Sequence, residues 1–139
     1  MEHSETLEIV RYRPGGVHIP HVDQYENEED LMAESPEYGN RFAQGLLCLK
    51  KPKFGGNFAM PLQGLSIVPE PGSLVIWHNT DLEGNMDYRS YHGGCRVFVG
   101  NKVAGSLTAM VLDQNKVQCM PVKNQTVSSP QKTIFQCLV

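Results

Sequence analysis

Short runs of apolar and polar residues, separated by turns rich in glycine and proline, recur along most of the chain. Residues 7–13 read LEIVRYR and precede the turn sequence Pro14-Gly15-Gly16, and residues 42–49 form an apolar run of buried-strand length. Gly100-Asn101 predicts a tight hairpin, and Pro20 predicts an edge or bulged position for its strand. Further strands are expected at residues 17–22, 58–61, 65–68, 73–78, 96–99 and 102–112.

Residues 24–40 have a different character, with six carboxylates and no lysine or arginine. We expect a solvated loop here, or a lid over a substrate, with one helical turn near residues 28–33. No other segment suggests a helix. The pattern therefore predicts an all-β dominated fold with few or no helices, of the jelly-roll or barrel type.

Composition limits the classes of function. A chain of 139 residues fits one domain, and its 40% hydrophobic and 19% charged residues are typical of a globular protein. No apolar run approaches the roughly 20 residues of a membrane span. The net charge of −3 gives no electrostatic argument for binding nucleic acid.

The cysteines and the targeting signals do not decide the cellular compartment of the protein. Cys48, Cys95, Cys119 and Cys137 are widely spaced and could form two disulfides or none. The first ten residues have neither a basic nor an apolar signal-peptide region, whereas Asn124-Gln125-Thr126 fits a glycosylation site.

The stretch from residue 12 to residue 23, YRPGGVHIPHVD, contains the most informative chemistry. Residues two apart on a strand share a face, so His21 and Asp23 should project together. His92 is the best candidate for a third ligand. Two histidines and one carboxylate are the ligand set of non-haem Fe(II) oxygenases. His18, three residues before His21, should face the other way and be structural.

Lys102 follows His92 by ten residues, across the predicted hairpin. A lysine on that strand could face the same cavity and hold the far carboxylate of a chelating diacid as a point charge. Its burial would be costly without an anionic partner. The position of Lys102 therefore suggests a carboxylated co-substrate.

Six ordered motifs now form a recognisable set over residues 7–112. They are Y-x-x-G-G-x-x-x-x-H-x-D, N-R-x-A-x-x-L-x-x-L, G-G before F-x-M-P, G-S-x-x-x-W, D-Y-R-x-x-H and V-G-N-K. This set resembles the catalytic domain of prolyl 4-hydroxylases of the alpha-subunit type, which are Fe(II)- and 2-oxoglutarate-dependent dioxygenases. The sequence departs from the family pattern at His18, Phe58 and Val103, where an aromatic residue, threonine and tryptophan are usual.

The resemblance implies a double-stranded β-helix (jelly roll) with His21, Asp23 and His92 as iron ligands. It implies that Lys102 and Tyr12 hold the distal carboxylate of 2-oxoglutarate, with no catalytic residue beyond the metal ligands. As a looser expectation, Arg89 and Trp77 would lie near the mouth where peptides bind.

The implied reaction is hydroxylation of peptidyl proline in a procollagen-like substrate. It is coupled to oxidative decarboxylation of 2-oxoglutarate to succinate and CO2, with L-ascorbate keeping the iron reduced. The resemblance also implies a proline-containing or collagen-like peptide partner, a partner subunit and a location in the endoplasmic reticulum lumen.

We expect residues 1–113 to be the catalytic domain, without the elements that usually precede its first strand, and residues 114–139 to be a polar tail. Two alternatives stay open. The chain could be a catalytically impaired short form that acts as a binding or regulatory module. It could also be a cupin-like protein that binds zinc or manganese without oxidative chemistry.

Overall fold

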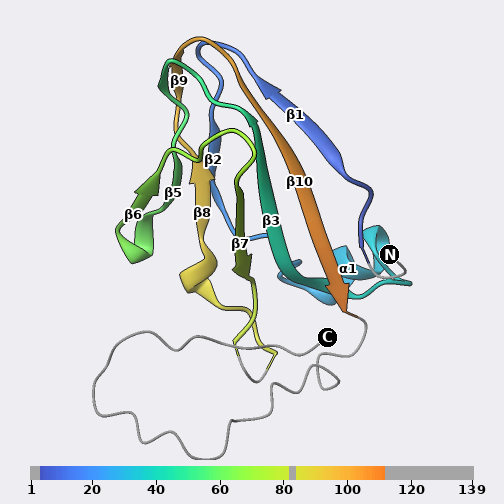
Figure 1. Ribbon diagram of the computed structural model, residues 1–139. Helices are drawn as coiled ribbons and strands as arrows, with labels where there is room; N and C mark the ends of the chain where they lie inside the picture. Colours follow the sequence, from blue (N-terminus) through green and yellow to red (C-terminus); the bar gives the residue numbers. More distant parts are fainter. Residues whose placement is uncertain (1–3, 82–83, 112–139) are drawn as a thin grey trace, which may run out of the picture.

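The computed structural model describes residues 4–81 and 84–111, which form a β-rich fold with one short helix (Figure 1). The elements in chain order are β1 Glu8–Tyr12, β2 His18–His21, α1 Glu28–Glu34, β3 Asn40–Lys50, β4 Phe54–Gly55, β5 Phe58–Met60, the 3-10 turn η1 Pro61–Gln63, β6 Leu65–Ile67, β7 Leu74–His78, the 3-10 turn η2 Tyr88–Ser90, β8 His92–Gly94, β9 Val97–Val99 and β10 Lys102–Val111.

Two four-stranded antiparallel sheets make up the body of the fold. The first has the order β1-β10-β3-β7 and contains the long strands β3 and β10, and the second has the order β2-β8-β5-β6. Figure 1 shows them as two layers, with the β4-β9 pair at one end. The predicted all-β, jelly-roll class is confirmed.

A small apolar core joins the two sheets. Phe58 and Met60 of β5 and Trp77 of β7 are buried in one cluster, with three half-buried residues packed against them. These residues alternate with outward-facing neighbours, as β-strands require. Because Phe58 and Trp77 come from opposite sheets, their contact fixes the two layers against each other beside the site described below.

All eight predicted strands are present, and none differs from its predicted range by more than two residues at either end. Strand β2 is an edge strand with a register irregularity around Pro20, as predicted. The helix α1 lies where a helical turn near residues 28–33 was expected and is one residue longer, and the Asn27 side chain caps it by accepting from the Asp30 backbone N–H at 2.8 Å. Residues 26–30 beside this cap are exposed, as expected for a solvated segment.

The predicted hairpin at Gly100-Asn101 is wrong. Strand β9 pairs with β4, whereas β10 pairs with β1 and β3, so the chain crosses from one sheet to another at this turn. Gly100 has a φ of 89°, which permits the sharp change of direction. Two short strands, β4 and β8, were not predicted, because two or three residues carry no detectable alternation.

Several predictions fall on residues that the structure does not describe. They concern the tail at residues 114–139, the Asn124 glycosylation site, and Cys119 and Cys137. Of the four cysteines, the two in the described ranges, Cys48 and Cys95, are free. No helix in the described part of the chain is long and apolar enough to cross a membrane.

Candidate metal centre

The three predicted ligands come together between strands β2 and β8. His21 at the end of β2 lies opposite His92 at the start of β8 in the strand register, and Asp23 follows β2 two residues later. One ligand atom from each residue lies within 4.8 Å of the others. His21 Nε2 is 3.4 Å from Asp23 Oδ1, and His92 Nε2 is 3.7 Å from Asp23 Oδ2. Asp23 and His92 are buried, and His21 is half-buried.

Each imidazole is oriented by a backbone carbonyl two residues earlier. His21 Nδ1 lies 2.8 Å from the Ile19 carbonyl oxygen, and His92 Nδ1 lies 2.8 Å from that of Ser90. A carbonyl can only accept, so each Nδ1 must carry the proton and donate it. The other ring nitrogen, Nε2, faces Asp23 in both histidines, and it can bind a metal once it carries no proton.

The electrostatics of the cluster favour an ionised carboxylate. Burial raises the pKa of Asp23, but the hydrogen bond with His21 and the charges of both histidines outweigh it, and the net pKa is lowered. The hydrogen bond with Asp23 raises the pKa of His21. Burial lowers the pKa of His92, which favours its neutral, metal-binding form.

The donor set and its spacing fit one small divalent ion. Metal–nitrogen and metal–oxygen bonds of about 2.1 Å at angles of about 90–120° place two donor atoms roughly 3.0–3.6 Å apart. The two histidine–carboxylate distances, 3.4 Å from His21 to Oδ1 and 3.7 Å from His92 to Oδ2 of Asp23, are close to this range. Two imidazoles and one carboxylate also match the preference of Fe(II), and three such ligands leave coordination positions open.

Aromatic rings enclose the buried side of the cluster. Trp77 packs on His92 with ring centroids 4.5 Å apart, and Phe58 lies 5.6 Å from His92 and 5.0 Å from Trp77. The indole Nε1 also donates to Asp23 Oδ2 at 3.2 Å. Trp77 was expected at the mouth of the site, and this prediction is wrong, because its ring is buried in the core.

Arg89 lies on the exposed turn η2, where its guanidinium binds Asp87 at 2.7 Å. It is not one of the residues that line the cavity described next. Its expected role at a peptide-binding mouth stays a prediction.

A cavity of about 300 Å³ extends from the ligand cluster between the two sheets. This volume lies at the lower end of the range for small-molecule sites. Lys102 and Tyr12, which are partners in the β10-β1 register, both line it. The sequence thus placed Lys102 in the correct cavity, although not through the hairpin that suggested it.

Lys102 is a buried cation, only 6% exposed. Burial lowers its pKa. Its ammonium lies 5.6 Å from the centroid of the Tyr12 ring, and no carboxylate in the described part of the chain forms an ion pair with it. Such a group is costly to bury unless an anion binds beside it. The Lys102 end of the cavity is therefore suited to a carboxylate.

His18 also lines this cavity, which corrects the prediction that it faces away from the ligands. Its ring centroid is 4.4 Å from that of His21, and its Nδ1 is 3.3 Å from the Tyr12 hydroxyl. The irregular register between His18 and His21 breaks the strict alternation on which the prediction relied. The Tyr12 hydroxyl therefore has a neighbour in the protein as well as access to the cavity.

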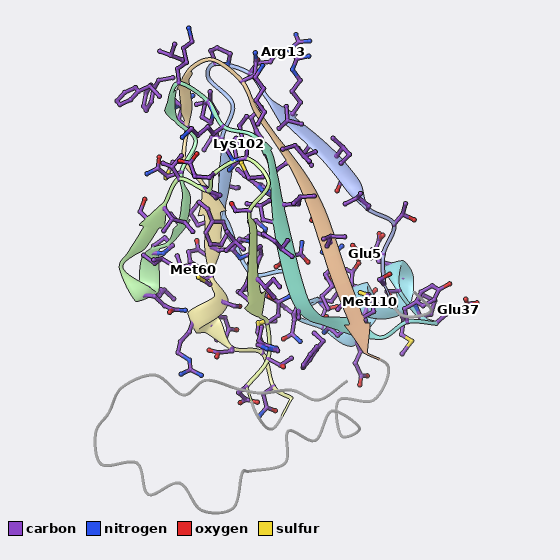
Figure 2. All side chains as sticks on the ribbon, in the orientation of Figure 1. Glu5, Arg13, Glu37, Met60, Lys102 and Met110 are labelled. Carbon is purple, nitrogen blue, oxygen red and sulfur yellow. The ribbon has the colours of Figure 1, made fainter. Side chains whose placement is uncertain are left out.

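The opposite end of the cavity holds polar residues that sequence reasoning missed. Arg41 Nε donates to Glu5 at 2.8 Å, and its Nη1 donates to the Asp23 backbone carbonyl at 3.3 Å. Figure 2 shows Lys102 and Glu5 toward opposite ends of the molecule's long sheet. Arg41 belongs to a quoted motif, but Glu5 is 36 residues away, and no local signal joins the two.

Comparison with known proteins adds sequence relatives to this geometry. The chain is 34% identical over 99 residues to prolyl 4-hydroxylase subunit alpha-1 of Homo sapiens and 33% identical over 102 residues to that of Caenorhabditis elegans. It is 35% identical over 99 residues to subunit alpha-2 of Gallus gallus. These matches cover 71%, 73% and 71% of the chain.

The chain is a relative of the prolyl 4-hydroxylase alpha subunits. It spans only 18% of the length of these three alpha subunits. Among solved structures, it matches a viral collagen prolyl hydroxylase from Paramecium bursaria Chlorella virus-1, solved as its 2OG complex. That match has a TM-score of 0.69 at 21% identity and covers 79% of this chain and 60% of the viral one, so it supports the shared jelly-roll fold. No protein-family model matches the chain.

Proposed function

We propose that this chain carries the catalytic centre of an Fe(II)- and 2-oxoglutarate-dependent prolyl 4-hydroxylase. The observation that carries the proposal is the presence, in one cavity, of a two-histidine, one-carboxylate cluster and a buried lysine without an acidic partner in the described residues. The histidine–carboxylate cluster suits a metal that must keep coordination positions open. The buried lysine suits the free carboxylate of a chelating diacid. The relationship to the alpha subunits supports the same reading.

In this proposal His21, Asp23 and His92 hold the iron, which supplies the activation of O2 for the hydroxylation. The Nδ1 hydrogen bonds to Ile19 and Ser90 keep both imidazoles oriented. Phe58 and Trp77 exclude water from the buried side of the centre.

Lys102 provides a fixed positive charge for the distal carboxylate of 2-oxoglutarate, and the Tyr12 hydroxyl can donate to the same carboxylate. The protein contributes binding, orientation and a shielded site, and the metal and co-substrate carry the oxidative step. With both bound, O2 and 2-oxoglutarate would be consumed, succinate and CO2 would form, and the peptide proline would be hydroxylated.

The finer parts of the proposal follow from the resemblance to the family. The substrate is a proline-containing, collagen-like peptide, L-ascorbate returns oxidised iron to Fe(II), and the chain works with a partner subunit in the endoplasmic reticulum lumen. Residues 1–113 are assigned to the catalytic domain.

The purified chain, given Fe(II), 2-oxoglutarate, ascorbate and a proline-rich peptide, tests this function. Succinate should form in the presence of peptide and should disappear in His21→Ala. If the protein binds Fe(II) but forms no succinate, the chain is a binding or regulatory module. If it binds zinc or manganese but neither Fe(II) nor 2-oxoglutarate, the cupin-like alternative is correct.

A further inference from the structure

Trp77 contacts two of the three proposed metal ligands in different ways. Its ring packs on the imidazole of His92, with centroids 4.5 Å apart and planes at 55°, and its Nε1 donates to Asp23 Oδ2 at 3.2 Å. The residue is only 9% exposed and belongs to the core cluster. An indole in this position is fixed by packing, so the direction of its N–H is fixed as well.

The two oxygens of Asp23 consequently have different surroundings. Oδ2 accepts the indole N–H and lies 3.7 Å from His92 Nε2, whereas Oδ1 lies 3.4 Å from His21 Nε2. The Asp23 side chain is 4% exposed, so water has little access to either oxygen. An indole nitrogen can only donate, so its bond with an acceptor oxygen cannot reverse when the site fills.

We propose that Trp77 is a positioning residue that fixes the orientation of the Asp23 carboxylate through the hydrogen bond from its indole N–H to Oδ2. The inference rests on the proposed function. Hydrogen bonds of this kind orient metal ligands, so loss of the indole N–H should weaken metal binding at the site. Because 2-oxoglutarate is proposed to bind the metal-loaded centre, its binding should weaken as well.

The replacement Trp77→Phe tests this assignment, because it keeps an aromatic ring against His92 and removes the N–H donor. The probe is Co²⁺, added alone and then followed by 2-oxoglutarate, with affinities from calorimetry and coordination from the visible absorption spectrum. Loss of a hydrogen bond to a metal ligand typically weakens metal binding about 10–100-fold. We expect weaker Co²⁺ binding within this range, an altered Co²⁺ spectrum and weaker 2-oxoglutarate binding.

Phe58→Leu is the matched control, since Phe58 packs on both Trp77 and His92 but donates no hydrogen bond. A role in packing alone predicts that the two variants change affinity alike and keep the wild-type Co²⁺ spectrum. A second version of the test covers the case in which Trp77→Phe does not fold. The chain has one tryptophan, so a sulfur analogue of tryptophan without the N–H can be incorporated at this position alone.

The outcomes are separable. A changed spectrum with weakened Co²⁺ binding, in Trp77→Phe or in the sulfur analogue but not in Phe58→Leu, supports the positioning role. Wild-type affinity and spectrum in the variant lacking the N–H overturn it, while the proposed function stands. Absence of Co²⁺ binding by the wild-type chain overturns the proposed function and this inference with it.

Discussion

Replacement of Lys102 by methionine should make the metal-free protein more stable and should abolish tight binding of 2-oxoglutarate. Lys102 is 6% exposed, and no carboxylate of the described residues forms an ion pair with it. A buried donor without a partner costs about 1–3 kcal/mol. Methionine has similar length and fills the same space without the charge. The free energy of unfolding should therefore rise by about 1–3 kcal/mol, or roughly 4 °C in Tm for each kcal/mol.

The pH dependence should change in the same variant. Burial lowers the folded-state pKa of Lys102 below its ordinary value of 10.5. The unfolded chain therefore holds this proton to higher pH than the folded chain does, and stability should rise with pH between the two pKa values. Lys102→Met should lack this rise. Its stability advantage over the wild type should shrink as pH increases through that window.

Lys102→Met should weaken the binding of 2-oxoglutarate, although it stabilises the metal-free protein. Removal of one partner of a buried charge pair costs about 2–5 kcal/mol of binding, or roughly 30-fold and more in affinity. Thermal unfolding of the Co²⁺-loaded protein with and without 2-oxoglutarate measures both effects, and Lys50→Met, which removes an exposed lysine, is the control. A Lys102→Met protein that is no more stable than the wild type, and that 2-oxoglutarate still stabilises fully, would refute the reasoning.

Two further predictions concern the framework of the site. Gly93→Ala should lower the free energy of unfolding by about 1–3 kcal/mol and weaken metal binding, because the added Cβ would lie 2.8 Å from the His18 carbonyl oxygen and 3.0 Å from Pro20. Gly94→Ala is the control and should keep the wild-type Tm, because the nearest contact of its added Cβ is at 3.4 Å. Equal Tm values for the two variants would contradict this packing argument. Asp23→Asn should reduce the acid sensitivity of the metal-free protein, because burial is outweighed by the hydrogen bond with His21 and the folded-state pKa of Asp23 is lowered. The ionised carboxylate thus stabilises the fold above the ordinary pKa of about 3.9 and loses this effect as pH falls through the lowered pKa. Acid unfolding followed by circular dichroism measures the acid sensitivity of both proteins. Unchanged acid sensitivity in Asp23→Asn would count against this role of Asp23.

The sequence predicted the ligand cluster well, because His21 and Asp23 are close in the chain and belong to a motif. The spacing of two residues predicted that these side chains lie together, although β2 ends at His21 and Asp23 lies just beyond it. His92 was found through its motif, and its position opposite His21 is confirmed by the β2-β8 pairing. Local patterns and a recognisable motif set were therefore sufficient for the centre itself.

Alternation failed where the backbone is irregular or where contacts cross between sheets. His18 faces the cavity because the register shifts around Pro20. Pro20 predicted an edge or bulged strand, but the pattern did not indicate which way His18 would then face. The Trp77–Asp23 hydrogen bond joins residues 54 apart, and the Arg41–Glu5 pair joins residues 36 apart. The first contact depends on how the two sheets face each other, and the second depends on which strands are neighbours in the first sheet. Single-strand patterns encode neither.

The most direct test of the central claim is mass spectrometry of a proline-rich, collagen-like peptide after incubation with the chain, Fe(II), 2-oxoglutarate and O2. Proline residues should gain the mass of one oxygen atom, in proportion to the succinate formed. His21→Ala, Asp23→Ala and His92→Ala should each abolish the gain. A peptide that stays unmodified in the presence of Fe(II)-loaded wild-type protein, or one that is modified equally by the three variants, would show that this cluster is not a hydroxylation centre.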